Sequence, residues 1–138
     1  MEPGKGRLKE MDMRIINPDD VMAPMGGYAQ GVDAGGMVFV AGQAGVDRAG
    51  QPVDGGMAAQ TRQTLANVAA VLRDAGLGLK DVVSTTVFVK DFTDYKLFDE
   101  VWQECFGDHK PARATMKADL VFPALLVEVQ AIAVRPAG

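Results

Sequence analysis

Apolar residues recur at helical spacing in two stretches of the chain. In the first, residues 57–75, they return every three or four positions, and Gly76 supplies a stop signal directly afterwards. The second stretch begins after a capping residue, either Asp91 or Thr93, and ends at Gly107. Four residues are expected on its inner face: Phe98, Val101, Trp102 and Cys105. Each stretch therefore predicts a helix with one buried face.

Extended segments surround these helices, and the β-branched run at 82–89 predicts a strand most clearly. The expected strands lie near 13–16 and at 29–33, 37–43, 82–89, 112–117 and 125–134. The resulting order, β-β-β-α-β-α-β-β, predicts an α+β fold in which two crossover connections place both helices on one face of a mixed sheet. The other face has no helix to cover it, and such a face usually packs against another subunit.

Composition narrows the classes of function. The 138 residues fit one domain, and the polar residues 1–12 are expected to form a flexible leader before a domain at 13–138. A formal net charge of −4 argues against nucleic acid as the main partner, because phosphate binding requires a basic surface. No apolar run approaches the roughly 20 residues that span a bilayer, and no membrane partner is expected. The single Cys105 cannot form an internal disulfide, so the cytoplasm is the expected location.

The residue inventory also excludes several catalytic chemistries. One histidine, His109, and one cysteine leave no cluster for zinc. A serine triad would have to use Ser84, the only serine, which lies inside an expected strand. Neither the dinucleotide-binding nor the P-loop glycine motif occurs. Catalysis therefore falls to Arg, Glu, Asp, Tyr and backbone amides, and no metal is expected.

Glu128 stands out in the last expected strand. The alternate positions around it are apolar on both faces, with Leu126, Ile132 and Val134 on its own face, so we expect this strand to be covered on both sides. A carboxylate there is costly unless it is paired or neutral. Two interpretations stay open: a structural carboxylate in an ion pair or at a strand edge, or a proton carrier whose pKa is raised by desolvation.

Arg113 follows Pro111 and Ala112 at the start of the expected strand 112–117. An arginine there is either a solvated surface residue or a fork of donors that holds a substrate carboxylate in a bidentate manner. A carboxylate anchor and a proton carrier on neighbouring strands would be enough for the hydrolysis of a small acid.

The combination of several short segments resembles the RidA/YjgF reactive-intermediate deaminases. In chain order these are Tyr28-Ala29-Gln30-Gly31, Val40-Ala41-Gly42-Gln43, residues 85–91, Pro111-Ala112-Arg113, and residues 127–134. The resemblance runs from about Ile16 to Arg135. It implies a chorismate-mutase-like fold, a homotrimer with active sites in the clefts between subunits, and no metal or organic cofactor. The implied reaction is the hydrolysis of 2-imino acids and their enamine tautomers to 2-oxo acids and ammonium.

Position by position, the resemblance implies that Arg113 holds the substrate carboxylate and that Glu128 orients or activates the attacking water. Thr115 falls where the family often has Cys, whose backbone amide contacts the same carboxylate. The implied substrate contacts are Tyr28, Ala41, Gly42, Phe88, Asp99, Arg113 and Thr115. If Glu128 is structural, Asp99 is the second candidate for activating water.

Three departures from the family pattern leave the preferred substrate open. Ala41 lacks the hydroxyl of a family serine, Asp99 adds a negative charge where many relatives have Asn, and Gln130 replaces a second Glu. The alternative to an enzyme is a non-catalytic ligand-binding or chaperone-like trimer of the same fold. Retention of both Arg113 and Glu128 favours the enzyme.

Overall fold

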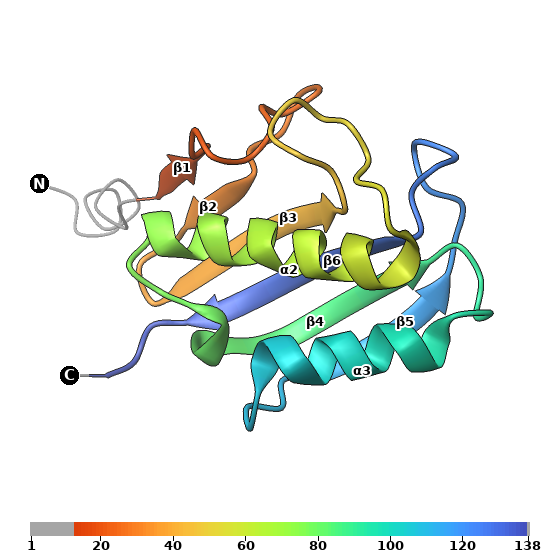
Figure 1. Cartoon of the computed structure of the whole chain (residues 1–138). Coiled ribbons are helices and arrows are strands. Elements are labelled where there is room, and N and C mark those ends of the chain that lie inside the picture. Colours follow the sequence, from red (N-terminus) through yellow and green to blue (C-terminus); the bar gives the residue numbers. More distant parts are fainter. Residues whose placement is uncertain (1–12, 138) are drawn as a thin grey trace, which may run out of the picture.

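One six-stranded mixed sheet, with two α-helices lying across one of its faces, makes up the computed structural model (Figure 1). The structure describes residues 13–137, so the expected leader 1–12 lies outside the described residues. The strands are β1 (Arg14–Ile16), β2 (Gly31–Asp33), β3 (Met37–Ala44), β4 (Val82–Val89), β5 (Ala112–Lys117) and β6 (Val127–Val134). The helices are α2 (Gly56–Asp74), α3 (Tyr95–Phe106) and the short 3-10 helix η1 (Leu79–Asp81). This order of strands and α-helices confirms the predicted fold class.

The order of strands across the sheet differs from their order along the chain. It is β1-β2-β3-β6-β4-β5, so the last strand is inserted between β3 and β4. The pair β4–β5 is parallel, and every other pair is antiparallel. Because β4 and β5 run in the same direction, the chain crosses over between them through α3 (Figure 1). One consequence for the site is that β4 separates β5 from β6.

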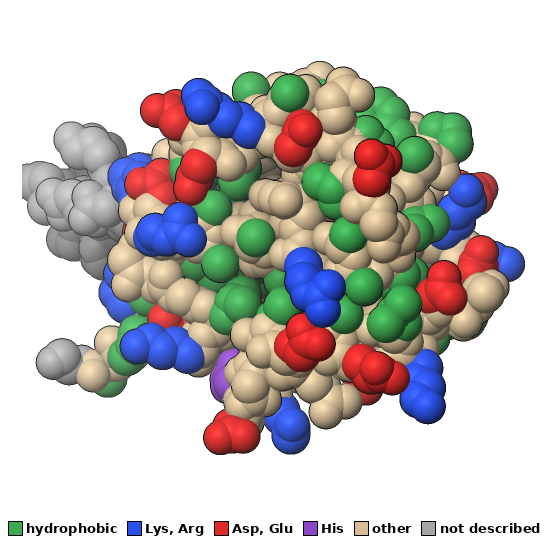
Figure 2. Space-filling view, in the orientation of Figure 1, with side chains coloured by type: hydrophobic (Ala, Val, Ile, Leu, Met, Phe, Trp, Pro, Cys, Tyr) green, Lys and Arg blue, Asp and Glu red, His purple; other side chains and the backbone are tan. Residues whose placement is uncertain are grey.

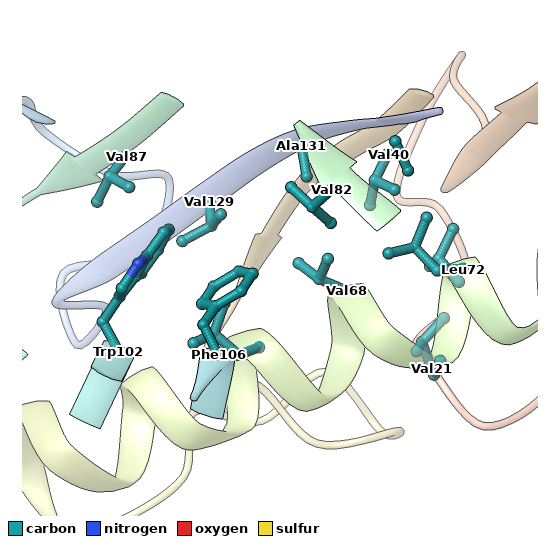
Figure 3. Packing of buried hydrophobic residues seen from close by; sticks show 14 of the residues in the cluster. Val21, Val40, Val68, Leu72, Val82, Val87, Trp102, Phe106, Val129 and Ala131 are labelled. Carbon is teal, nitrogen blue, oxygen red and sulfur yellow. The ribbon is translucent and has the colours of Figure 1, made fainter. Parts of the chain in front are cut away.

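The core lies between the sheet and the helices. Figure 3 shows Val129 and Ala131 of β6 on the side of the sheet where α2 and α3 pack. Both residues are at most 1% exposed, as is Leu72 of α2. Because side chains alternate along a strand, Glu128 and Gln130 point away from the helices. None of the described helices is both long and apolar enough to cross a membrane.

Local signals explain where α2 ends and why the expected start of α3 is wrong. Gly76, at φ +77°, follows α2 in a left-handed conformation that glycine adopts without strain, as predicted. The expected cap of α3 by Asp91 or Thr93 is wrong, because the helix begins at Tyr95. Asp91 instead accepts a hydrogen bond from the backbone N–H of Thr93 at 2.9 Å, which forms a turn before the helix.

The sheet face opposite the helices is apolar and exposed. Ile15, Phe39 and Met116 expose 67%, 41% and 42% of their surface on or beside it. The expectation that both faces of the last strand are covered therefore fails within residues 13–137, where Val134 is 40% exposed. The helix-bearing face, by contrast, carries interspersed acidic and basic side chains (Figure 2). An apolar face of this kind is suited to contact with another chain.

Candidate active site

Glu128 lines a pocket of about 370 Å³. Tyr28, Ala41 and Gly42, all named from the sequence, line the same pocket. So do apolar side chains that the sequence did not assign to the site: Met22, Met25, Val46, Val121, Phe122 and Leu125. The expected start of the last strand at residue 125 is wrong. The strand begins at Val127, which leaves Leu125 in the preceding loop and free to face the pocket.

Gly42 leaves room for the carboxyl group of Glu128. The pairing of β3 with β6 shifts between Val40 and Gln43, as in a β-bulge, and this irregularity contains Ala41 and Gly42. A Cβ atom on Gly42 would lie 2.9 Å from Cδ of Glu128 and closer still to Oε2. A side chain at this position would therefore displace the carboxyl group.

The variant Gly42→Ala is expected to fold but to lose at least about tenfold in turnover, because a displacement near 1 Å at a reacting group is costly. The carboxyl group of Glu128 is the free end of a flexible side chain, so it can move aside without disturbing the sheet. Thermal unfolding by circular dichroism measures the first effect, and the rate of the imine hydrolysis that the resemblance implies measures the second. Gly36→Ala is the control, because no heavy atom lies within 4 Å of a Cβ there. A parental rate in Gly42→Ala would show that the reaction does not depend on the position of the Glu128 carboxyl group.

Two buried glutamines fix one wall of the pocket. Gln43 Nε2 donates a hydrogen bond to Gln30 Oε1 at 2.7 Å, and Gln30 Nε2 donates to the carbonyl oxygen of Met22 at 2.9 Å. Their exposed fractions are 4% and 2%. Both residues lie in the segments that resemble the RidA/YjgF family, but no local feature of the sequence assigns them a role. They hold the loop around Met22 against β3.

A third glutamine fixes the opposite wall. Gln60 of α2 donates from Nε2 to the carbonyl oxygen of Ala124 and accepts at Oε1 from the N–H of Leu126, both at 2.8 Å. Lys90 Nζ donates to the carbonyl oxygen of Pro123, also at 2.8 Å. These contacts position the segment 118–126, which carries Phe122 and Leu125 into the pocket.

Burial raises the pKa of the Glu128 carboxyl above its ordinary value. This confirms the predicted direction, although the surroundings differ from those expected. The apolar contacts come largely from loops rather than from strand neighbours. Within residues 13–137 the carboxyl group has no hydrogen bond or ion pair. A carboxyl group of this kind can carry a proton closer to neutral pH than an exposed glutamate.

Arg113 lies against α3 on the other side of the sheet. Its Nη1 donates to Asp99 Oδ1 at 2.8 Å, and its Nη2 donates to the hydroxyl of Tyr95 at 2.6 Å. Its Cζ lies 5.0 Å from the ring centre of Trp102 and 5.3 Å from that of Phe98. Arginine suits this position because its planar cation can stack on rings and donate from its edges at the same time.

Arg113 and Glu128 point to opposite faces of the sheet. Arg113 pairs with Thr85, which pairs with Ala131 on the helix-bearing face. Glu128 is three positions from Ala131 in β6, so its side chain has the opposite direction. The expectation that the two residues lie on neighbouring strands is also wrong, because β4 lies between β5 and β6. Arg113 therefore has no part in the raised pKa of Glu128, which burial alone causes.

The remaining expected site residues divide between the same two faces. Phe88 pairs directly with Glu128 and shares its face. Thr115 lies two positions from Arg113 and borders a shallow pocket with Phe92 and Tyr95. We call Tyr28, Ala41, Gly42, Phe88 and Glu128 the Glu128 group, and Asp99, Arg113 and Thr115 the Arg113 group. No set of His, Cys, Asp or Glu side chains in the described part of the chain is arranged to hold a metal ion.

Comparison with known proteins connects this geometry to a family. The family model described as endoribonuclease L-PSP matches residues 19–135. The chain belongs to this family. It is 38% identical over 125 residues to the 2-iminobutanoate/2-iminopropanoate deaminase of Escherichia coli K12, a match that covers 88% of this chain and 98% of the relative. A RutC family protein of Pyrococcus horikoshii is 39% identical over 86% of this chain and 95% of its own length.

Solved structures of the family confirm the fold. The crystal structure of the YjgF gene product of E. coli has a TM-score of 0.83 and 37% identity, over 89% of this chain and 99% of that one. E. coli TdcF, solved with bound serine, has a TM-score of 0.83 and 34% identity, over 89% and 99% of the two chains. The resemblance to RidA/YjgF proteins seen in the sequence is thereby confirmed.

Proposed function

We propose that the chain is a hydrolytic deaminase of reactive 2-imino acids and their enamine tautomers. The observation that carries the proposal is the Glu128 carboxyl group, half-buried in a mostly apolar pocket without a hydrogen-bond or ion-pair partner among residues 13–137, and with a raised pKa. A structural carboxylate would be expected to have an ion pair or hydrogen bonds, since burial alone destabilises its charged form. The deaminase name of relatives at 38% identity supports the same reaction.

The residues divide the work of an imine hydrolysis between them. Arg113 holds the substrate carboxylate, with the backbone amide of Thr115 beside it. A protonated imine carbon is already electrophilic, so the enzyme needs a positioned water and a proton path rather than a nucleophile. Glu128 takes a proton as that water attacks C2. It returns that proton to the nitrogen of the tetrahedral adduct. As the C–N bond breaks, the hydroxyl group gives up its remaining proton to the departing ammonia, so that ammonium and the 2-oxo acid are released.

This chemistry requires the Arg113 group and the Glu128 group to reach one small substrate. Within one chain they are on opposite faces of the sheet. We infer that the Arg113 group of one copy lies against the Glu128 group of another. Such a contact joins two different surfaces, and repeated contacts of this type form a ring when the rotation between neighbouring copies closes. A homotrimer with sites in its clefts, as the resemblance implies, meets this requirement, and the exposed apolar face offers contact area.

The proposed reaction is tested by a coupled assay. An amino-acid oxidase generates 2-iminopropanoate and 2-iminobutanoate in situ, and their loss is followed with and without the protein. We expect the protein to accelerate the loss of both, because each has the carboxylate and the C=N bond that the two groups address. Unchanged rates, together with saturable binding of a 2-oxo acid, would instead support the non-catalytic binding protein.

A further inference from the structure

The Arg113 group contains a second charge that the proposed reaction does not use. The Asp99 carboxylate accepts from Arg113 Nη1 through Oδ1 and from Gln103 Nε2 through Oδ2, each at 2.8 Å. The hydrogen bond from Arg113 lowers the pKa of Asp99, so this carboxyl group stays ionised at neutral pH. Asp99 and Arg113 line the same pocket of about 520 Å³, and the Asp99 side chain is 33% exposed. A ligand at Arg113 therefore meets a negative charge next to the positive one.

Asp99 does not exclude a ligand from Arg113. The guanidinium group has more N–H donors than its contacts with Asp99 and Tyr95 use. The rings of Phe98 and Trp102 hold its position independently of the ligand. Lys110 lines the same pocket and attracts any anion in the same way. Asp99 adds a repulsion of the ligand's carboxylate, which a positive charge elsewhere on the ligand can offset.

Substrate and product of the proposed reaction differ in one of those charges. A protonated 2-imino acid carries a carboxylate and, two bonds away from the carboxyl carbon, a cationic nitrogen. The 2-oxo acid keeps the carboxylate but has lost the nitrogen. The carboxylate of the imino acid can therefore pair with Arg113, and its cationic nitrogen can pair with Asp99. The 2-oxo acid is attracted by Arg113 and repelled by Asp99.

We propose that Asp99 is a specificity-determining residue, which makes the Arg113 group favour zwitterionic ligands with a carboxylate and an adjacent cationic nitrogen over simple anions. The inference rests on the proposed function for the role of Arg113. In a deaminase the same preference weakens the hold on the product as soon as ammonia leaves. Asp99 then promotes release of the product as well as selection of the substrate.

The test compares two ligands with the same carbon skeleton, 2-oxobutanoate and 2-aminobutanoate. The second is a stable zwitterion that stands in for the protonated imine. Trp102 is the only tryptophan of the chain and stacks on Arg113, so its fluorescence reports binding at this place. Asp99→Asn keeps an oxygen that accepts from Arg113 and removes the charge. Glu104→Gln is the matched control, because it removes one charge from the same helix at an exposed residue that pairs with Arg62.

The full-length Asp99→Asn variant is expected to bind 2-oxobutanoate about tenfold more tightly than the parent and to bind 2-aminobutanoate more weakly, as expected for removing one charge a few ångströms from each ligand. Glu104→Gln should leave both affinities unchanged. Equal affinities of parent and Asp99→Asn for each ligand would overturn the inference, and so would the absence of saturable binding in the parent. Binding is measured without turnover, so the two proposals can fail separately. If the parent hydrolyses imines but Asp99→Asn changes neither affinity, this inference alone is overturned. Selective binding without hydrolysis would overturn the deaminase instead.

Discussion

Glu128→Gln is expected to slow imine hydrolysis by about 100- to 10,000-fold, the usual contribution of a positioned acid–base group. Gln keeps the shape of the side chain but cannot take a proton from water. Binding of 2-oxobutanoate should stay close to the parental value, because Arg113 supplies the main contact with the carboxylate. The coupled imine assay measures the first effect, and the fluorescence of Trp102 measures the second.

The same variant has a second, independent signature in stability. Because burial raises the pKa of Glu128 in the folded state, the folded protein is favoured by low pH. That contribution is fully present below the unfolded value of about 4.5 and is lost as pH rises through the higher folded value. Glu128→Gln does not titrate, so its melting temperature should exceed that of the parent at neutral pH, by a margin that shrinks at acid pH. Parental turnover in this variant would show that Glu128 is structural.

Asp99, the second candidate for activating water, would then have to take its place. It is a weaker base than the sequence suggested, since Arg113 lowers its pKa.

Arg113→Ala is expected to reduce kcat/KM by about 30-fold to several thousand-fold, since loss of one partner of a buried charge pair costs about 2–5 kcal/mol. The side chain is 19% exposed and is held by Asp99, Tyr95 and the rings of α3. Arg113→Lys retains the charge without the planar fork, so we expect it to recover only part of the loss. Circular dichroism and light scattering show whether both variants keep the fold and the assembly. Near-normal activity in Arg113→Ala would show that Arg113 does not anchor the substrate carboxylate.

Mixing the two inactive variants tests where the site is formed. In a randomly mixed ring, about a quarter of the contacts join an intact Arg113 group to an intact Glu128 group from different copies. Co-expressed Arg113→Ala and Glu128→Gln chains should therefore regain about a quarter of parental activity. If the groups acted within one copy, each site would carry one of the two substitutions and the mixture would be inactive.

The elements of the fold could be predicted because their signals are local. The β-branched run of β4 and the helical spacing of apolar residues in α2 need no knowledge of the rest of the chain. Which strands lie side by side is not a local property. The insertion of β6 between β3 and β4 separates Arg113 from Glu128, and nothing within either segment indicates it.

In the site, too, local features could be predicted and contacts between distant segments could not. The two central residues were named from short segments, and the raised pKa of Glu128 followed from its apolar neighbourhood. The glutamines that build the pocket could not be assigned, because their partners are distant in sequence. Gln60, for example, is 66 residues from Leu126, with which it shares a hydrogen bond. A polar residue in a predicted helix does not show by itself that it holds a loop.

Backbone hydrogen bonds tie the wall of the Glu128 pocket formed by the segment 118–126 to β4 only at its ends, where the N–H of Ala118 donates to Val89 and the N–H of Lys90 donates to Leu126. Gln60 and Lys90 provide three hydrogen bonds to its backbone, and Val121 at its tip is 66% exposed. Segments tied in this way open locally at a lower free-energy cost than the sheet beneath them. Once this wall opens, water reaches the carboxyl group, which then behaves as an ordinary glutamate and no longer exchanges protons near neutral pH. On heating, the protein should therefore lose the proposed activity while its sheet and helices are still intact.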